Sequence, residues 1–388
     1  MNNFLHKICP ELLKVVELKK DNQLNDCVVY ANEYLKLKKE VEKLNTAYFE
    51  YPFINAIGVK LSQKQIVKFA KTSLVGFISK QTKVTTQVNV AKTILNIDKI
   101  KEKNLGEDVT LAVIDTGINP HIDFCLPQNR IIKFVDLVNK SEYPYDDNGH
   151  GTFVTSIACG NGIAGAKKYS GISPKTKIVA IKALEENGET GAYKILEAMQ
   201  WISDNYKKYN IRVVCMSFGA SPLGRNDPLV VGAESLWNMG IVVVAAAGNS
   251  GPDNHTIKAP GYSSKIITVG GLDDKRDEND NFDASQFQIA NFSSRGPAGI
   301  FFKPDLIAPA VNITGACFNK DSGTFYVKMS GTSVATPMIA GICCLICSKY
   351  PNITPDQLKV RLLRTCKTIS HNKNEEGFGL PTLKNFLI

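Results

Sequence analysis

The stretch Met329-Ser330-Gly331-Thr332-Ser333-Val334-Ala335-Thr336-Pro337, followed by the apolar run from Ile339 to Tyr350, decides how this chain folds. It predicts a turn that feeds a buried helix. Ser333 and Pro337 are expected in the first turn, where the N–H groups have no intrahelical partner and a proline is tolerated. Ser333 would lie at the positive end of that helix, where a developing anion is stabilised. The stretch alone fits a capping serine as well as a nucleophile.

Two other motifs place an acid and a base at element boundaries. The apolar run Val109–Ile114 ends in Asp115-Thr116-Gly117, which predicts a strand with a carboxylate at its end. The segment Asp147-Asn148-Gly149-His150-Gly151-Thr152 predicts a helix that begins near His150. Asp, His and Ser are the side chains of a nucleophilic triad, in which the imidazole takes the hydroxyl proton. Asp123 and Asp147 are the alternatives to Asp115 as the acid.

In their residues and in their order along the chain, these motifs resemble those of the subtilisin-like serine proteases (subtilases). A fourth segment, Ala245–Pro252, resembles the one that carries the family's oxyanion-hole Asn. Four motifs in the family's order are a specific signal, whereas any one of them is weak. The resemblance implies that Ser333 is the nucleophile, His150 the base and Asp115 its orienting acid. It also implies that Asn249 donates to the oxyanion beside the Ser333 N–H.

The resemblance further implies where a polypeptide substrate binds. Ser217-Phe218-Gly219 matches the segment along which an extended peptide pairs, and Gly191-Ala192-Tyr193 matches the opposing segment. Ala246-Ala247-Gly248 would wall the first specificity pocket. Lys258 stands at a pocket-floor position that is often Gly in the family. A lysine there predicts either a preference for an acidic side chain or a smaller pocket.

The apolar pattern predicts two domains. Residues 1–87 follow the order β-α-β-β-α-β, a small ferredoxin-like α+β domain. They resemble the inhibitory propeptide of many subtilases, with residues 80–87 as the tail that would occupy the substrate cleft. An unrelated α+β appendage is the alternative. Residues 88–388 alternate Val/Ile runs with longer helices, which predicts an α/β fold with a doubly wound, mainly parallel sheet, subtilisin-like by resemblance.

Within residues 88–388 the strands and helices are expected at definite places. Asp115 and Asn249 would stand at the C-terminal ends of strands, where ligands of such sheets bind. The expected strands are 110–114, 177–184, 213–218, 241–246 and 266–269, and the expected helices are 151–159, 191–206, 228–239 and 333–349.

Composition and charge indicate which kinds of binding partner and which cellular compartment to expect. The 388 residues are 44% hydrophobic and 21% charged, as in ordinary globular proteins, and no apolar run approaches the roughly 18 residues of a membrane span. Of the net charge of +9, residues 1–87 carry 14 Lys against 8 acidic residues. These lysines alternate with Glu on a predicted helix, so we expect neither a nucleic-acid nor a membrane partner. A missing signal-peptide core and ten cysteines, expected as free thiols, favour the cytoplasm.

No cofactor is required by the expected chemistry, and no metal site is predicted. Asp146-Asp147 and the acidic stretch from Asp273 to Asp283 could hold a structural calcium ion, but a solvated loop is the favoured interpretation. The segment Cys159–Gly171 lacks the Asn-rich calcium loop of secreted subtilisins. With the run Lys167–Pro174, it resembles the intracellular, AprX-type branch of the family.

The sequence therefore predicts a serine endopeptidase that hydrolyses extended polypeptide through an acyl-enzyme on Ser333. It would be made as a zymogen that cuts itself around Val84–Val88 and is inhibited by its own residues 1–87. One alternative is a catalytically silent subtilase fold that retains the propeptide in its cleft as a binding scaffold. The other is an α/β-hydrolase esterase, which requires Gly-x-Ser-x-Gly and the chain order Ser-Asp-His.

Overall fold

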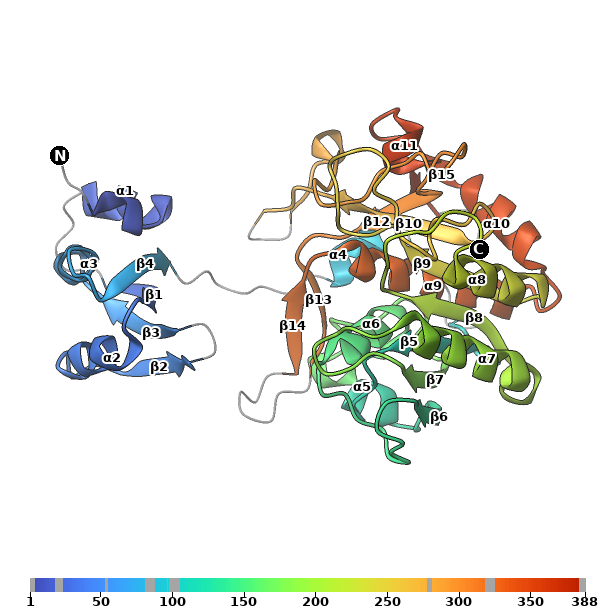
Figure 1. Ribbon diagram of the computed structural model, residues 1–388, viewed down its shortest axis with the longest axis horizontal. Coiled ribbons are helices and arrows are strands. Elements are labelled where there is room, and N and C mark those ends of the chain that lie inside the picture. The colour runs from blue at the N-terminus through green and yellow to red at the C-terminus, as the bar shows by residue number, and fades with distance from the viewer. Residues whose placement is uncertain are drawn as a thin grey trace. The chain divides into compact units, whose positions relative to one another are not determined.

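A computed structural model describes residues 4–17, 24–52, 55–80, 88–95, 97, 105–277, 281–317 and 325–383. The chain divides into two compact units, Met1–Val84 and Thr85–Ile388, close to the predicted boundary between residues 87 and 88 (Figure 1).

The N-terminal unit has the expected α+β layout. Its antiparallel sheet has the order β2-β3-β1-β4, so the first and third strands are central. Helix α3 begins with a capping box, in which the side chains of Ser62 and Gln65 each bond the other's backbone N–H. The elements are α1 (Pro10–Glu17), β1 (Asn25–Ala31), α2 (Tyr34–Glu42), β2 (Tyr48–Tyr51), β3 (Ala56–Leu61), α3 (Gln63–Ala70) and β4 (Val75–Lys80).

The two faces of this small sheet differ. The helices α1, α2 and α3 pack on one face and bury alternate strand residues such as Cys27 and Val29. The opposite face carries the aromatic side chains of Tyr30, Phe49 and Phe77. Tyr30 and Phe77 are register partners with ring centroids 6.5 Å apart, and Phe49 is 68% exposed. The unit thus presents an aromatic face that its own helices leave uncovered.

The second unit is built on the predicted mainly parallel sheet, of order β11-β10-β9-β8-β5-β7-β6, with β12 also paired to β10. Every residue of β5 is buried, as expected for a strand covered on both faces. Only the short β11 runs antiparallel to its neighbour among these described strands. The strands are β5 (Thr110–Asp115), β6 (Ile131–Asp136), β7 (Lys177–Lys182), β8 (Ile211–Met216), β9 (Val242–Ala246), β10 (Ile267–Asp273), β11 (Gln288–Ile289) and β12 (Leu306–Pro309).

Helices cover both faces of this sheet (Figure 1). Helices α6 and α9 pack together and against the central strands, while α7 and α8 pack together on the other side. The helices are α4 (Val88–Ile94), α5 (Ile122–Cys125), α6 (His150–Cys159), α7 (Ala192–Tyr209), α8 (Pro228–Asn238), α9 (Thr332–Lys349), α10 (Pro355–Leu363) and α11 (Lys373–Glu376). Two hairpins complete the unit: β13 (Ile313–Ala316) with β14 (Tyr326–Met329), and β15 (Cys366–Lys367) with β16 (Leu380–Pro381).

Helix α9 is the predicted core helix, and it begins one residue earlier than expected. By length and composition it could cross a membrane, but it is buried inside this unit, as a core helix is. The expectation that Pro337 lies in the first turn is wrong. The helix starts at Thr332, so Pro337 lies in the second turn, where its missing N–H leaves the Ser333 carbonyl without a helical donor.

Candidate active site

Three neighbouring strands end beside one another at the C-terminal edge of the sheet. Asp115 is the last residue of β5, Ser217 follows β8, and Asn249 lies just beyond β9. These strands are parallel and adjacent in the order β9-β8-β5. Because neighbouring strands lie about 4.8 Å apart, the ends of β5 and β9 are separated by about 10 Å. Side chains can bridge that distance, so this edge can assemble one site.

His150 is held by Asp115 at this edge. It is the first residue of α6, after Gly149 with φ 97°, and its Nδ1 lies 2.7 Å from Asp115 Oδ1. The carboxylate is 1% exposed, and its Oδ1 also accepts the Thr116 N–H at 2.8 Å. With Nδ1 occupied by the carboxylate, Nε2 is the ring nitrogen left to exchange a proton.

The environment of His150 favours its charged form. Burial disfavours the imidazolium, but the charge and hydrogen bond of Asp115 and the charge of Asp146 outweigh burial and raise the pKa of His150 above 6.5. Asp115 therefore stabilises the cation that forms when the imidazole takes a proton, which is the role of the acid in a triad.

Asp146 positions this pair, a role that the sequence did not indicate. Its Oδ1 accepts the Thr116 hydroxyl and the Gly149 N–H, both at 2.8 Å. Its Oδ2 accepts the N–H and the hydroxyl of Thr152 at 2.8 and 2.6 Å. These bonds join the residue after Asp115 to the first turn of α6. Asp146 thus fixes the acid and the base relative to each other.

The alternative acids are engaged elsewhere. Asp147 pairs with the buried Lys182, Nζ to Oδ1 at 2.6 Å. Asp123 accepts the Tyr326 hydroxyl at 2.7 Å and the Ala164 N–H at 2.9 Å. Neither carboxylate hydrogen-bonds His150 in the described part of the chain. Asp115 is therefore the acid of the pair.

Ser333 lies in the first turn of α9, the helix that packs against α6 and its first residue His150. Both α6 and α9 begin at this sheet edge and run in the same direction. A Cβ on Gly341 of α9 would lie 2.7 Å from the carbonyl oxygen of Ala158 in α6. Gly341 and Ala158 are equally far along the chain from Ser333 and His150, which puts the two side chains at the same level. No hydrogen bond joins Ser333 Oγ to His150 among the described contacts, and such bonds often form only once substrate is bound.

The Asn249 side chain is oriented by Thr332, the residue before Ser333. Its Oδ1 accepts the N–H and the hydroxyl of Thr332 at 2.9 and 3.0 Å, so its NH₂ group faces the other way. A Cβ on Gly331 would lie 3.3 Å from Asn249 Nδ2 and 3.1 Å from Ser333 Oγ. Ser333 Oγ and Asn249 Nδ2 therefore border the same small space, an arrangement that an oxyanion site needs.

The segment Ser217–Gly219 provides the expected edge for an extended peptide. Among the described residues, no main-chain hydrogen bond involves Ser217, Phe218 or Gly219. Buried main-chain polar groups are nearly always paired, so this row of N–H and C=O groups is suited to an incoming strand. Ser217 is buried, and Gly219 is exposed.

The opposing segment differs from the prediction. Helix α7 begins at Ala192, so Tyr193 lies in its first turn, and the extended main chain ends at Gly191. The Tyr193 ring covers Gly191, where a Cβ would lie 2.6 Å from ring atom Cε1. The interpretation of Ala192 and Tyr193 as part of an extended edge is therefore wrong, because helical main chain cannot pair as a strand.

The predicted pocket wall lies next to the oxyanion site. Ala246, Ala247 and Gly248 are buried, and Gly248 donates its N–H to the Thr332 hydroxyl at 3.1 Å. The backbone N–H of Lys258 bonds the Ala247 carbonyl at 2.9 Å. The structure thus brings the proposed wall and the proposed floor residue together.

The acidic stretch and the C-x-x-C pair that could suggest a metal site are paired or buried. Asp273 pairs with Lys275, and Asp274 pairs with Arg276. Cys344 and Cys347 have C-x-x-C spacing, but both are buried in α9, and burial raises the pKa of both thiols. Within the described residues, no three His, Cys, Asp or Glu side chains form a group that could hold a metal ion.

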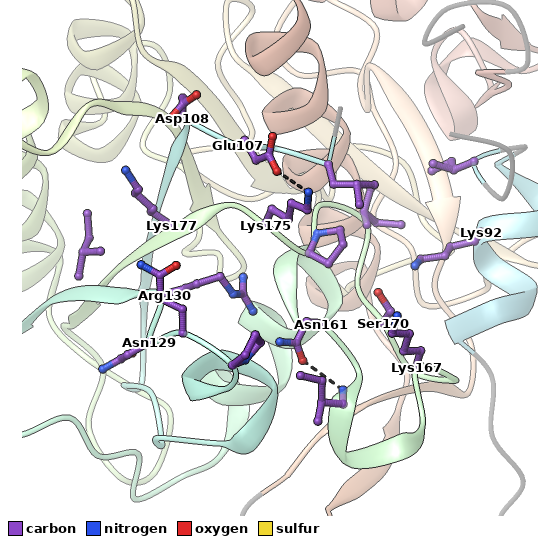
Figure 2. A pocket seen from close by; sticks show the side chains of 18 residues that line it. Lys92, Glu107, Asp108, Asn129, Arg130, Asn161, Lys167, Ser170, Lys175 and Lys177 are labelled. Atoms are coloured by element: carbon purple, nitrogen blue, oxygen red, sulfur yellow. Dashed lines mark hydrogen bonds and ion pairs between the residues drawn. The ribbon is translucent and has the colours of Figure 1, made fainter. Parts of the chain in front are cut away.

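A cavity of about 850 Å³ opens elsewhere on the second unit (Figure 2). Its lining includes Arg130, Lys177 and the ion pair of Lys175 with Glu107. None of the residues at the sheet edge described above lines it.

Comparison with known proteins identifies the family. Residues 106–379 match the subtilase family. The chain belongs to the subtilase family of serine proteases. This subtilase is 40% identical over 301 residues to Serine protease AprX of Bacillus subtilis (strain 168), a match that covers 72% of the chain and 66%, just under two thirds, of that relative. It is 30% identical over 320 residues to Thermostable alkaline protease of Halalkalibacterium halodurans, covering 81% of the chain and 79% of the relative.

Solved structures agree with the fold of this subtilase. S41 Psychrophilic Protease superposes with a TM-score of 0.65 at 26% identity, over 78% of this chain and 100% of the other. Sphericase, at 24% identity, gives a TM-score of 0.63 over 78% and 100%. The predicted subtilisin-like α/β fold is confirmed.

Replacing Asn249 with leucine is expected to lower kcat by about 10²–10³, the loss that follows removal of one oxyanion donor in subtilisin. The amide that borders the nucleophile's space would be gone, whereas binding of the substrate backbone would change little, so KM should stay close to its original value. Steady-state kinetics on a peptide substrate measure both constants. Asn254→Leu, at an exposed position of the same loop, is the control. An unchanged kcat in Asn249→Leu would exclude Asn249 from the oxyanion site.

Proposed function

We propose that this subtilase is an endopeptidase that hydrolyses extended polypeptide through an acyl-enzyme on Ser333. The observation that carries the proposal is the pairing of His150 with Asp115 at the sheet edge where Ser333 Oγ and Asn249 Nδ2 border one space. A serine hydroxyl is a weak nucleophile alone, and an adjacent base activates it.

The steps follow from these groups. Ser333 Oγ attacks the substrate carbonyl as its proton passes to His150 Nε2. Asn249 Nδ2 and the Ser333 N–H donate to the tetrahedral oxyanion. His150 then gives the proton to the leaving amine, and the acyl-enzyme remains. A water molecule, deprotonated by the same imidazole, then attacks the acyl carbonyl. The ester bond to Ser333 breaks, the carboxylic acid half of the substrate leaves, and His150 returns the proton to Ser333 Oγ.

The form of the substrate follows from the unpaired main chain of Ser217–Gly219. Those N–H and C=O groups are complementary to a peptide in β conformation, not to a helix. A polypeptide must therefore present an unfolded or loop segment to be cut. Folded proteins without such loops should resist hydrolysis.

We further propose that the N-terminal unit is an intramolecular inhibitor that the protease itself removes. Its ferredoxin-like layout and its open aromatic face, with Tyr30, Phe49 and Phe77, suit a unit that packs on a partner surface. The predicted inhibitory tail, residues 80–87, lies outside the described residues apart from Lys80. The proposed cut around Val84–Val88 falls in that same stretch.

Ser333→Ala protein should remain full length under conditions in which the wild type shortens, because the nucleophile that cuts the junction is missing. Mass spectrometry of the purified proteins gives the new N-terminus, expected within 84–88. Adding mature wild type to full-length Ser333→Ala separates intramolecular from intermolecular cutting. If wild type and Ser333→Ala shorten alike, another protease makes the cut and self-processing is refuted.

One observation favours a second candidate, a catalytically silent scaffold. Ser333 Oγ forms no hydrogen bond to His150 among the described contacts. A fluorophosphonate probe reacts only with an activated serine, so labelling of wild type and loss of labelling in His150→Ala support the protease. Absence of labelling after the N-terminal unit has been removed would support the scaffold. The esterase alternative does not fit the family match or the chain order Asp-His-Ser.

We also propose a reducing compartment, the cytoplasm, as the place of action. All ten cysteines are free thiols, and no two of them form a disulfide. Cys159 and Cys215 are fully buried, and burial raises their pKa to about 11 and about 12. Thiols of this kind suit a compartment that keeps cysteine reduced.

A further inference from the structure

The Lys258 side chain is held between two glycines of the candidate active site. A Cβ on Gly219 would lie 2.6 Å from Lys258 Cβ, and a Cβ on Gly248 would lie 2.4 Å from Lys258 Cγ. Any larger residue at either position would overlap this side chain. Gly219 ends the segment that is free to pair with substrate, and Gly248 directly precedes Asn249. The aliphatic part of the Lys258 side chain therefore lies between the peptide-binding segment Ser217–Gly219 and the proposed oxyanion donor Asn249.

The Lys258 ammonium has no hydrogen-bond or ion-pair partner within the described chain. The residue is nevertheless half-buried. Three other buried or half-buried lysines of this unit pair with a carboxylate: Lys182 with Asp147, and Lys303 and Lys359 with Asp305. A partly buried, unpaired cation is unfavourable, and an anion that reaches it gains a charge-assisted hydrogen bond.

We propose that Lys258 makes this protease select an acidic side chain, Glu or Asp, on the substrate residue whose carbonyl is attacked. This deepens the proposed endopeptidase function and rests on it. Asn249 fixes where that carbonyl oxygen lies, and the free main chain of Ser217–Gly219 fixes the direction of the peptide. The side chain of the same residue then lies beside Gly219 and Gly248, next to Lys258, which is the charged group there.

An acidic loop near His150 disfavours further negative charge on the substrate. Glu185, Glu186 and Glu189 are exposed, and none forms an ion pair among the described residues. Asn148, two residues before His150, donates its Nδ2 hydrogen to the Glu186 carbonyl at 2.7 Å, which places this acidic loop beside the base. Additional carboxylates on the substrate would meet like charge there. A single acidic residue is therefore selected, not an acidic run.

The chain's own junction is a poor match to this preference. No Asp or Glu occurs from Tyr51 to Ile97, a range that contains the proposed cut around Val84–Val88. The first cut must then be made at a neutral residue. A neutral residue can still be cut there, because the junction belongs to the same molecule as the active site and is therefore present at a high effective concentration.

The test uses three peptides that differ at one position, with Glu, Gln or Leu before the cleaved bond and no other acidic residue. They are assayed with wild type that is expressed as the full chain and allowed to process itself. The Lys258→Met variant and the control Lys133→Met, which removes the same charge from the exposed side of β6, are prepared in the same way. Wild type should prefer Glu to Gln by about tenfold or more in kcat/KM, as a hydrogen bond between charged groups implies. Lys258→Met should reduce this ratio to one or below, and Lys133→Met should leave it unchanged.

The possible outcomes separate this inference from the function on which it rests. A wild type that prefers Leu or treats Glu and Gln alike overturns the role of Lys258, and so does a Glu preference that survives Lys258→Met. In those cases the peptides are still cut and Ser333 is still labelled by fluorophosphonate, so the endopeptidase stands. If no peptide is cut and Ser333 is not labelled, the endopeptidase fails, and the specificity fails with it.

Discussion

His150→Ala is expected to lower kcat for peptide hydrolysis by about 10⁶, as is Ser333→Ala, and the double variant should lose no more than either, as found when the triad of subtilisin is dismantled. The hydroxyl is reactive only while the imidazole can take its proton. Once one of the two is absent, the other contributes nothing further. The losses should therefore fail to add.

Burst and steady-state kinetics on one peptide measure these losses against the uncatalysed rate. The residual activity should stay above that rate, because Asn249 and the substrate edge remain. His255→Ala, at an exposed position after the Asn249 turn, is the matched control and should retain full kcat. Losses that add in the double variant would show that Ser333 and His150 act independently, which a triad excludes.

Asp115→Asn is expected to lower kcat by about 10⁴, because an amide at this position holds the imidazole in the wrong tautomer and no longer stabilises its cation. It should also move the acid limb of the pH profile of kcat/KM. The base works only when neutral, so activity falls as the pH drops through the pKa of His150.

The direction of that movement follows from the terms that set the pKa of His150. In the wild type, Asp115 raises that pKa above 6.5 against the effect of burial. In Asp115→Asn, burial still lowers the pKa of His150, but the negative charge of Asp115 that raised it is lost. The pKa therefore falls, and the acid limb moves to lower pH. Asp253→Asn, at an exposed position of the loop after Asn249, should leave the limb in place. An acid limb at the same pH in Asp115→Asn would show that another group titrates.

The sequence was sufficient for the elements whose signals are local and strong. Strand β5 and helix α9 are continuous apolar runs that end at distinctive motifs, and both were predicted close to their observed bounds. Strand β6 was missed although its sequence is mostly apolar, with Ile131, Ile132, Phe134 and Val135, so that signal was available too. Helix α10 was missed although Thr354 and Gln357 form a capping box with Pro355 at the first position, a signal that was available.

In the candidate site, too, the residues that belong to local motifs were predicted, and those that act through distant contacts were missed. Motifs identified Asp115, His150, Ser333 and Asn249, because each carries chemistry at a recognisable spacing. The positioning roles of Asp146 and Thr332 depend on hydrogen bonds between segments far apart in the chain, and no local pattern shows them. The errors at Pro337 and Tyr193 both lie near helix starts, although each start was predicted within one residue; the roles given to these two residues were wrong, not the helices.

The bond from the Thr332 N–H to Asn249 bears on how the enzyme would fail on heating. Thr332 opens α9, and its hydroxyl also accepts the Gly248 N–H, so one residue secures both the helix start and the exit of β9. Local unfolding of that turn would displace the nucleophile and the oxyanion donor together. Thermal inactivation would then be a single event at this junction, which partial melting elsewhere need not trigger.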